Sequence, residues 1–211
     1  EKNYIFLVDA PGYLPEMTLA YQKASPGRTL TARYCMRGEI LEALRTGKAD
    51  FATLIPPLQP SECPELESRT MYFDPGRIFL PPDSPLLKKD VLTLDDLRDL
   101  PIVTSPKGGG IRGDLDLFFA RHGLRPNIVS ELADASTVVM MVSQGGACGV
   151  MNVGFMDHPV WGRYCRRHNT DLGGEVALCW NRRLTQQPSA QRFIAFAQTF
   201  FAGLLQYQKT E

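Results

Sequence analysis

Hydrophobic and polar positions alternate with two different periods along the N-terminal part of the chain. A short β-rich run at 4–8 stops at a turn cluster of Asp, Ala, Pro and Gly, and apolar residues then recur at helical spacing. The pattern repeats, and it predicts strands at 4–8, 29–34 and 49–55 with helices at 14–24 and 37–46. This order of strands and helices is typical of a parallel sheet covered by helices.

A proline-rich stretch at 56–60 interrupts this rhythm, which returns in the second half of the chain. Two extended runs follow the prolines, and Thr93 with a carboxylate three residues later marks a helix start. The extended runs lie at 66–73 and 77–80, the next strands at 101–104, 127–132, 148–152 and 175–180, and the helices at 112–122 and 136–144. The chain ends in a helix with Phe193, Phe196, Phe200 and Leu204 on one stripe.

Two similar α/β series, the second inserted before the final strand and helix, predict two lobes. We place lobe I at residues 1–75 plus 181–211 and lobe II at residues 76–180. We expect a cleft between the lobes, lined by the carboxyl ends of strands and the N-termini of helices. Parallel-sheet proteins bind ligands at this edge because backbone N–H groups and helix dipoles converge there.

Composition narrows the range of functions. Lys+Arg and Asp+Glu each total 23, so the net charge is zero, which excludes a broad nucleic-acid-binding surface on this segment. The longest apolar runs are far shorter than the roughly 20 residues of a membrane helix. Five widely spaced cysteines without a C-x-x-C pair match neither a zinc site nor a secreted disulfide scaffold, so we interpret them as reduced cytoplasmic thiols.

Four segments carry a pattern of motifs in a fixed order. They read L-x-x-G-x-x-D at 44–50, a proline-rich p-x-x-h-P-L run at 79–86, v-t-l-x-D-L at 91–97, and V-x-x-G-x-G-i at 142–150. Together they resemble the effector-binding domain of LysR-type transcriptional regulators, and the resemblance covers nearly the whole chain. Two positions depart from the family, since Asp9 stands where a Gly usually closes the first strand and Cys148 stands where a Gly is frequent.

The resemblance implies an α/β, two-lobed fold of the type II periplasmic-binding-protein kind, in which each lobe is a mostly parallel sheet with helices on both faces. It also implies a sensor rather than an enzyme, which binds a small, anionic metabolite in the inter-lobe cleft without cofactor or metal. We expect the N-terminal winged helix-turn-helix of such regulators to be absent from this chain, so that DNA is contacted only through that domain. The expected partners are the effector and a second copy of this domain, with a tetramer for the full-length protein and no membrane.

Polar and small residues stand where the strands of each lobe end and the next helices begin. The predicted ligand-binding residues are Asp9, Ala10, Pro11, Gly12, Arg37, Thr104, Ser105, Ile111, Arg112, Ser136, Thr137, Met151 and Asn152. The two arginines offer bidentate hydrogen bonds to a carboxylate. Structural alternatives stay open: an ordinary turn after the first strand, a solvated Arg37, and helix caps at Thr104, Ser105, Ser136 and Thr137.

The glycine-rich segment 108–113 satisfies the dinucleotide pattern G-x-G-x-x-G, and Glu131 follows at about the right distance. Residues 105–108 separate the strand from the helix-forming glycines, where the fingerprint needs a tight turn, so we favour a flexible loop over the cleft. A nucleotide-binding enzyme that uses this loop is one alternative function, and a periplasmic-type solute-binding protein of a transporter is another. The three histidines form no recognisable catalytic motif, and the Cys165 and His168 pair is the remaining candidate for a metal or thiolate site.

Overall fold

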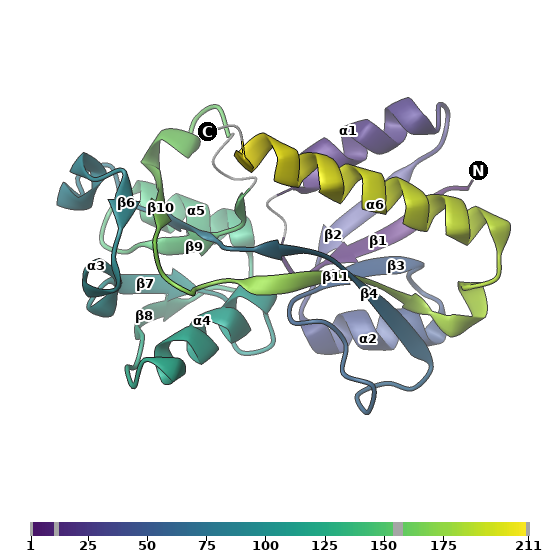
Figure 1. Ribbon diagram of the computed structural model, residues 1–211, viewed down its shortest axis with the longest axis horizontal. Coiled ribbons are helices and arrows are strands. Elements are labelled where there is room, and N and C mark those ends of the chain that lie inside the picture. The colour runs from purple at the N-terminus through teal and green to yellow at the C-terminus, as the bar shows by residue number, and fades with distance from the viewer. Residues whose placement is uncertain (1, 11–12, 154–157, 210–211) are drawn as a thin grey trace. The chain divides into compact units, whose positions relative to one another are not determined.

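The computed structural model describes residues 2–10, 13–153 and 158–209. These residues form two compact units: the first runs up to Phe73 and resumes at Glu175, and the second is Asp74–Gly174. The chain therefore passes between the units twice (Figure 1). The second crossing differs from the boundary after residue 180 that the sequence suggested, because the strand predicted at 175–180 forms part of the first unit's sheet.

The first unit is a five-stranded sheet in the order β2-β1-β3-β11-β4 with helices α1, α2 and α6. Its strands are β1 (Tyr4–Val8), β2 (Leu30–Tyr34), β3 (Phe51–Leu54), β4 (Leu66–Asp74) and β11 (Gly174–Asn181), and its helices are α1 (Leu14–Ala24), α2 (Arg37–Thr46) and α6 (Pro188–Lys209). Strand β1 runs parallel to β2 and β3, whereas β11 runs antiparallel to β3.

Helices cover both faces of this sheet, which explains the nearly continuous apolar run in β1. Leu7 packs in one core cluster with Ile40 and Leu44 of α2, while the Phe6 ring contacts Phe193 of α6 on the other face, with centroids 6.0 Å apart. Strands that are buried on both faces need apolar residues at successive positions rather than at alternate ones. Helix α2 ends where Gly47 adopts φ +77°, the left-handed cap that the sequence predicted.

The second unit has a four-stranded sheet in the order β6-β10-β5-β9 and a parallel pair, β7-β8. Its strands are β5 (Arg77–Phe79), β6 (Val91–Leu92), β7 (Pro101–Thr104), β8 (Asn127–Glu131), β9 (Gly149–Met151) and β10 (Cys165–His168). Its helices are α3 (Leu94–Arg98), α4 (Gly110–Arg121) and α5 (Ala135–Ser143), with short 3-10 turns η1 (Pro85–Lys88) and η3 (Gly162–Tyr164). A bridge between Ile102 and Cys148 joins β7 to the start of β9.

Strand pairing in this unit is mixed rather than mostly parallel, because β5 runs antiparallel to both β9 and β10. Helices α3 and α4 cover one apolar cluster and α5 covers another. Thr93 caps α3 as predicted, in a capping box with Asp96. No helix in the described part of the chain has the length and apolar character that crossing a bilayer requires.

Candidate functional site

Two helices of the second unit begin at the same edge of its parallel strand pair. Strand β7 leads into α4 and strand β8 leads into α5, and the two strands are parallel, so both helix N-termini follow carboxyl ends of strands. A helix N-terminus carries partial positive charge and unsatisfied N–H groups. This edge is therefore the part of the second unit in which an anion would be most favourably held.

The start of α4 has donors to offer. Gly109 occupies the N-cap position and provides no side-chain cap, and the N–H groups of Gly110, Ile111 and Arg112 donate to no acceptor among the described residues. Thr104, at the end of β7, is buried, and the structure gives its hydroxyl no hydrogen bond within the described residues. Ser105 is half-buried beside it. Predicted contacts Thr104, Ser105 and Ile111 thus come together in one loop and helix start.

The Arg112 guanidinium makes several contacts within the second unit. Its Nε donates to both carboxylate oxygens of Asp116 at 3.1 and 3.0 Å, and one Nη donates to Glu131 at 2.8 Å. The same Nη donates to the Ser105 carbonyl at 3.1 Å, and the residue is 7% exposed. Arg112 therefore fixes the loop between β7 and α4. The pairing also occupies Glu131, the carboxylate that a dinucleotide site would direct at a ribose.

Arg37, the first residue of α2, has a comparable intrachain role. Its guanidinium forms a bidentate pair with Glu62 at 2.6 and 2.8 Å and donates to the carbonyls of Pro56 and Pro57. The hydrogen bond with Glu62 raises the pKa of Arg37, and the same pairing lowers the pKa of Glu62. The side chain holds the proline-rich stretch against α2, so these contacts give Arg37 a structural role.

Ser136 and Thr137 follow their capping alternative. Asp134 is the N-cap of α5 and accepts from the Ser136 amide, and the Ser136 hydroxyl donates to the other oxygen of Asp134 at 2.7 Å. The Thr137 hydroxyl donates to the Asp134 carbonyl at 2.7 Å. The first bond satisfies a backbone donor that the start of a helix leaves free, and the other two occupy the hydroxyls. The start of α5 therefore has less left for a ligand than the start of α4.

In the first unit, the end of β1 is buried. Asp9 and Ala10 are 2% and 1% exposed, and Asp9 Oδ2 accepts from the Ile55 amide at 2.8 Å. The Tyr13 hydroxyl donates to Thr53 at 2.5 Å. These bonds tie the loop after β1 to the end of β3. Pro11 and Gly12, which were also predicted to contact the ligand, lie outside the described residues.

Met151 and Asn152 belong to a buried junction near the start of the second unit. Met151 packs in the core cluster under α5, and the Asn152 amide donates to Asp74 Oδ2 at 3.1 Å. Asp74 also accepts from the backbone N–H groups of Gly76 and Val153. Asp74 was not predicted from the sequence, although its place before Pro75 and Gly76 is a turn signal.

Asp114 is a second residue that the sequence did not reveal. Its carboxyl lies against Gly174, so closely that a Cβ on that glycine would be 2.1 Å from Asp114 Oδ2. Burial, together with the negative charge of Asp74, raises the pKa of Asp114 to about 7, while Arg121 acts in the opposite direction. A carboxyl with such a pKa marks an unusual environment, and on the sequence it is one polar residue among several on a helix.

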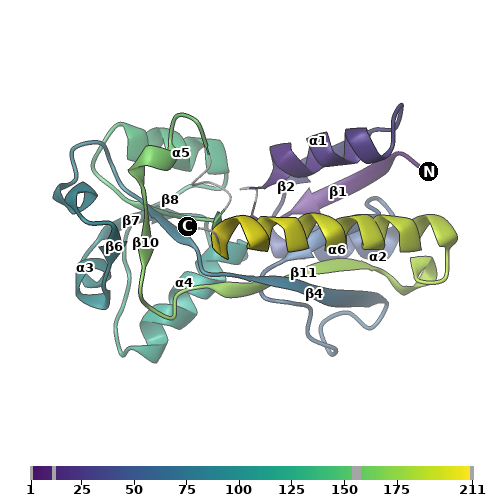
Figure 2. The same ribbon diagram turned by 45° about the horizontal axis from the view of Figure 1, so that its top comes forward.

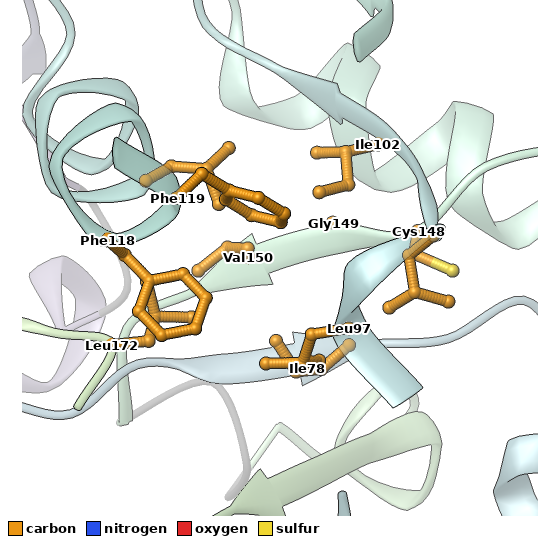
Figure 3. Close-up of a pocket in the computed structure, with 11 residues that line it drawn as sticks. Ile78, Leu97, Ile102, Phe118, Phe119, Cys148, Gly149, Val150 and Leu172 are labelled. Atoms are coloured by element: carbon orange, nitrogen blue, oxygen red, sulfur yellow. The ribbon is translucent and has the colours of Figure 1, made fainter. Parts of the chain in front are cut away.

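An apolar cavity in the second unit does not qualify as the ligand site. Side chains from α3, α4 and the neighbouring strands surround it, among them Leu97, Phe118, Phe119 and Val150 (Figure 3). Its volume is about 10 Å³, which is close to the minimum for one water molecule. It is a packing gap in the core cluster.

Among the described residues, no group of three or more His, Cys, Asp or Glu side chains is placed to hold a metal ion. Burial raises the pKa of the Cys165 thiol to about 12, and the His168 Nε2–H donates to the Pro75 carbonyl at 2.6 Å. Cys165 and His168 thus have separate structural surroundings, and these contacts do not join them in one metal or thiolate site.

Two α/β units joined by two crossings define a two-lobed domain of the type II periplasmic-binding-like class, and comparison with known proteins places the chain within it. The family model "LysR substrate binding domain" matches residues 8–202. The chain therefore belongs to the LysR substrate-binding domain family. That family is one of transcription regulators and not of enzymes.

Individual relatives agree with this assignment. The chain is 33% identical over 135 residues to the HTH-type transcriptional regulator AlsR of Bacillus subtilis, which is 63% of this chain and 44% of that protein. It is 30% identical over 138 residues to CysB of Haemophilus influenzae, covering 65% of this chain and 42% of that protein. The matches thus span less than half the length of these relatives. A mutant of OxyR from Corynebacterium glutamicum shares the fold with a TM-score of 0.79 at 18% identity, covering 99% of this chain and 66% of that one.

Proposed function

We propose that this chain is the effector-sensing domain of a LysR-type transcription regulator and that the start of α4 holds the anionic group of its ligand. The observation that carries the site is the uncapped first turn of α4, whose three N–H groups have no acceptor among the described residues, beside the hydroxyls of Thr104 and Ser105. Backbone N–H groups at a helix start bind carboxylates and small anions in many proteins.

Arg112 supports this site without contacting the ligand. By joining Asp116, Glu131 and the Ser105 carbonyl, it fixes the loop from which Ser105 and the first amides of α4 project. A preorganised loop pays little entropy when the ligand binds. The cleft expected between the lobes stays a prediction, and the contacts predicted for Asp9 and Ala10 stay with it.

The site is tested by a ligand screen with matched variants. The wild-type chain is screened by thermal shift against metabolite acids, aromatic acids, inorganic anions and NAD(H), where saturation at about 100 times the dissociation constant adds roughly 2.7 kcal/mol of stability. We expect Thr104→Val and Ser105→Ala to weaken binding of the stabilising acid. The control is Ser143→Ala at the far end of α5, whose hydroxyl donates to the Met140 carbonyl.

Each result of the screen decides between functions. An acid that keeps its affinity in the Thr104→Val, Ser105→Ala double variant places the ligand elsewhere. Stabilisation by NAD(H) supports the nucleotide-binding alternative through the glycine-rich loop. Silence across the whole panel contradicts an anion site at α4.

We further propose that the complete protein carries a DNA-binding domain, works in the cytoplasm and pairs through this domain with a second copy. The relatives named as HTH-type transcriptional regulators support the DNA-binding domain. The buried free thiols fit the reducing cytoplasm better than the oxidising compartment in which a transporter's solute-binding protein would work. Sedimentation of the chain with and without its ligand tests the pairing. A monomer at all concentrations in both states contradicts it.

A further inference from the structure

A pocket of about 140 Å³ lies in the first unit between the C-terminal end of α1 and the first turns of α6. The two helices lie side by side in both views (Figures 1 and 2). Tyr4, the first residue of β1, lines the pocket, whereas the predicted contact Asp9 follows the last residue of the same strand. The pocket is therefore at the opposite edge of the sheet from the strand ends at which the ligand was expected.

Four aromatic rings form the apolar wall of this pocket. The Phe193 ring has its centroid 4.8 Å from Tyr4, 5.8 Å from Tyr21 and 5.8 Å from Phe196. Tyr4, Tyr21 and Phe193 are at most 6% exposed. The Tyr4 hydroxyl donates to the Ser189 carbonyl at 3.0 Å, and the Tyr21 hydroxyl donates to a backbone carbonyl near the N-terminus. The rings are therefore held in place before any ligand arrives.

The volume fits a single aromatic ring. An apolar cavity of about 150 Å³ in another protein binds benzene, and this pocket is of nearly that size. Aromatic walls favour an aromatic guest, because edge-to-face and offset contacts between rings add to the gain from burial.

The mouth of the pocket supplies positive charge and a hydroxyl. Arg192 lines it, is exposed, and makes no ion pair with a described residue. Burial is the main cause of the raised pKa of Tyr4, and the charge of Asp50 also raises it. The charge of Arg192 lowers this pKa, so the Arg192 guanidinium is close enough to act electrostatically on the Tyr4 wall of the pocket. Ser25 also lines the pocket, is 8% exposed, and its hydroxyl has no hydrogen bond within the described residues.

We propose that this pocket binds a small aromatic carboxylate of the size of benzoate, with its ring against Phe193 and Phe196 and its carboxylate on Arg192 and Ser25. A guanidinium and a carboxylate form charge-assisted hydrogen bonds, which are stronger than neutral ones. The site is independent of the one proposed at α4, since every residue that lines it belongs to the first unit. Occupancy would fasten the start of α6 to the end of α1.

The test follows backbone amide signals of the isotope-labelled chain by NMR during a titration with benzoate. We expect the amides of Ala24 and Ser25 to shift and saturate with a dissociation constant of about 1 mM or lower. Arg192→Gln should raise this constant by about tenfold or more, because it removes a charge-assisted hydrogen bond. The matched control is Arg28→Gln, which removes an exposed positive charge three residues after Ser25, outside the pocket lining.

A second variant blocks the pocket without touching its charge. Ala24 is exposed on the last turn of α1 and lines the pocket, so Ala24→Leu should fold normally and fill the space that the ring would take. We expect it to abolish the benzoate shifts. Benzyl alcohol, which has the ring but no charge, should bind about tenfold or more weakly than benzoate.

The outcomes separate this inference from the proposed function. Unsaturated shifts at about 10 mM benzoate, an unchanged constant in Arg192→Gln, or equal binding of benzyl alcohol each overturn it. Shifts that move to residues 104–112 and vanish in the Thr104→Val, Ser105→Ala double variant also overturn it, while they support the site at α4. Shifts of Ala24 and Ser25 that depend on protein concentration in the absence of benzoate would show a second copy in the pocket and overturn it as well.

Discussion

Replacing Asp114 with Asn should stabilise the folded chain at neutral and alkaline pH and have a much smaller effect in mild acid. Burial, and after it the charge of Asp74, raises the pKa of Asp114 from the ordinary 3.8 to about 7, although Arg121 opposes the shift. A carboxyl whose pKa is higher in the folded chain binds its proton more tightly there. Its contribution to stability is therefore complete below about pH 4 and is lost as the pH rises through about 7.

The size of the effect follows from the two pKa values. Each unit of difference corresponds to 1.36 kcal/mol, so the step from 3.8 to about 7 amounts to about 4 kcal/mol at most. About 3 kcal/mol of this falls between pH 5 and pH 8. Asn has nearly the shape of Asp and cannot ionise, so Asp114→Asn removes this pH-dependent part.

The assay is urea denaturation of the wild type and the variant at about pH 5 and about pH 8, followed by circular dichroism. Comparing the two proteins at each pH cancels the other titrating groups. The control is Asp95→Asn on α3, whose side chain is 87% exposed and remains in solvent when the chain folds. It should leave the difference between the two pH values as in the wild type.

One result would refute the reasoning. If the stability gained through Asp114→Asn is the same at both pH values, the folded carboxyl is not protonated near neutrality. A carbon-detected NMR titration of the Asp114 side chain gives an independent check, with an expected midpoint at about pH 7.

Three further predictions concern packing, ion pairing and thiols. Gly174→Ala should cost about 1–3 kcal/mol of unfolding free energy, because its Cβ would lie 2.1 Å from Asp114 Oδ2, and Asp114→Ala in the same chain should restore most of the loss in a double-mutant cycle. Arg112→Gln should cost about 1 kcal/mol in a denaturation curve, since Glu131 is half exposed, and an unchanged curve would contradict its bracing role. The five buried cysteines should react with a thiol reagent only as fast as the chain unfolds, and rapid labelling of the native chain would contradict their burial.

The alternation of strands and helices was predictable because burial imposes it directly on the sequence. Strand β1 lies between two helical layers and is apolar at nearly every position, and Gly47 has the left-handed conformation expected of a helix cap. Strand β10 escaped prediction because it reads Cys165-Arg166-Arg167-His168. Its Arg166 is satisfied by carbonyls of Leu87 and Lys89, which lie 79 and 77 residues away in the sequence.

The placement of β11 could not be predicted for a related reason. Local pattern marks Glu175–Trp180 as a strand, but only pairing with β3 decides which sheet it joins. The same holds for the antiparallel pairing of β5 in the second unit. Register and direction depend on contacts between distant segments, which a single sequence does not display.

The two arginines show why the predicted site was only partly informative. Arg37 pairs with Glu62, 25 residues away, and Arg112 pairs with Glu131, 19 residues away. Burying a guanidinium without a partner raises the free energy of the folded state far more than burying an unpaired amide does. Buried arginines are therefore usually paired with carboxylates of the same chain. Neutral donors such as the first amides of α4 destabilise the fold less when they are unpaired, so they remain free to bind a ligand.

Because the α4 site uses neutral donors, ligand binding there should depend only weakly on salt. Around the start of α4, the charge of Arg112 is offset by Asp116 and Glu131, and exposed Lys107 brings the local sum close to zero. Apart from the partial charge of the helix start, a monoanion bound there meets little net side-chain charge that salt can screen, so its dissociation constant should change less than about twofold between 0.05 and 0.5 M salt. Benzoate bound at the exposed Arg192 should bind several-fold more weakly at the higher salt concentration than at the lower one. Calorimetry at both salt concentrations measures this, and a tenfold loss for the α4 ligand would mean that a cationic side chain, and not the helix start, holds its charge.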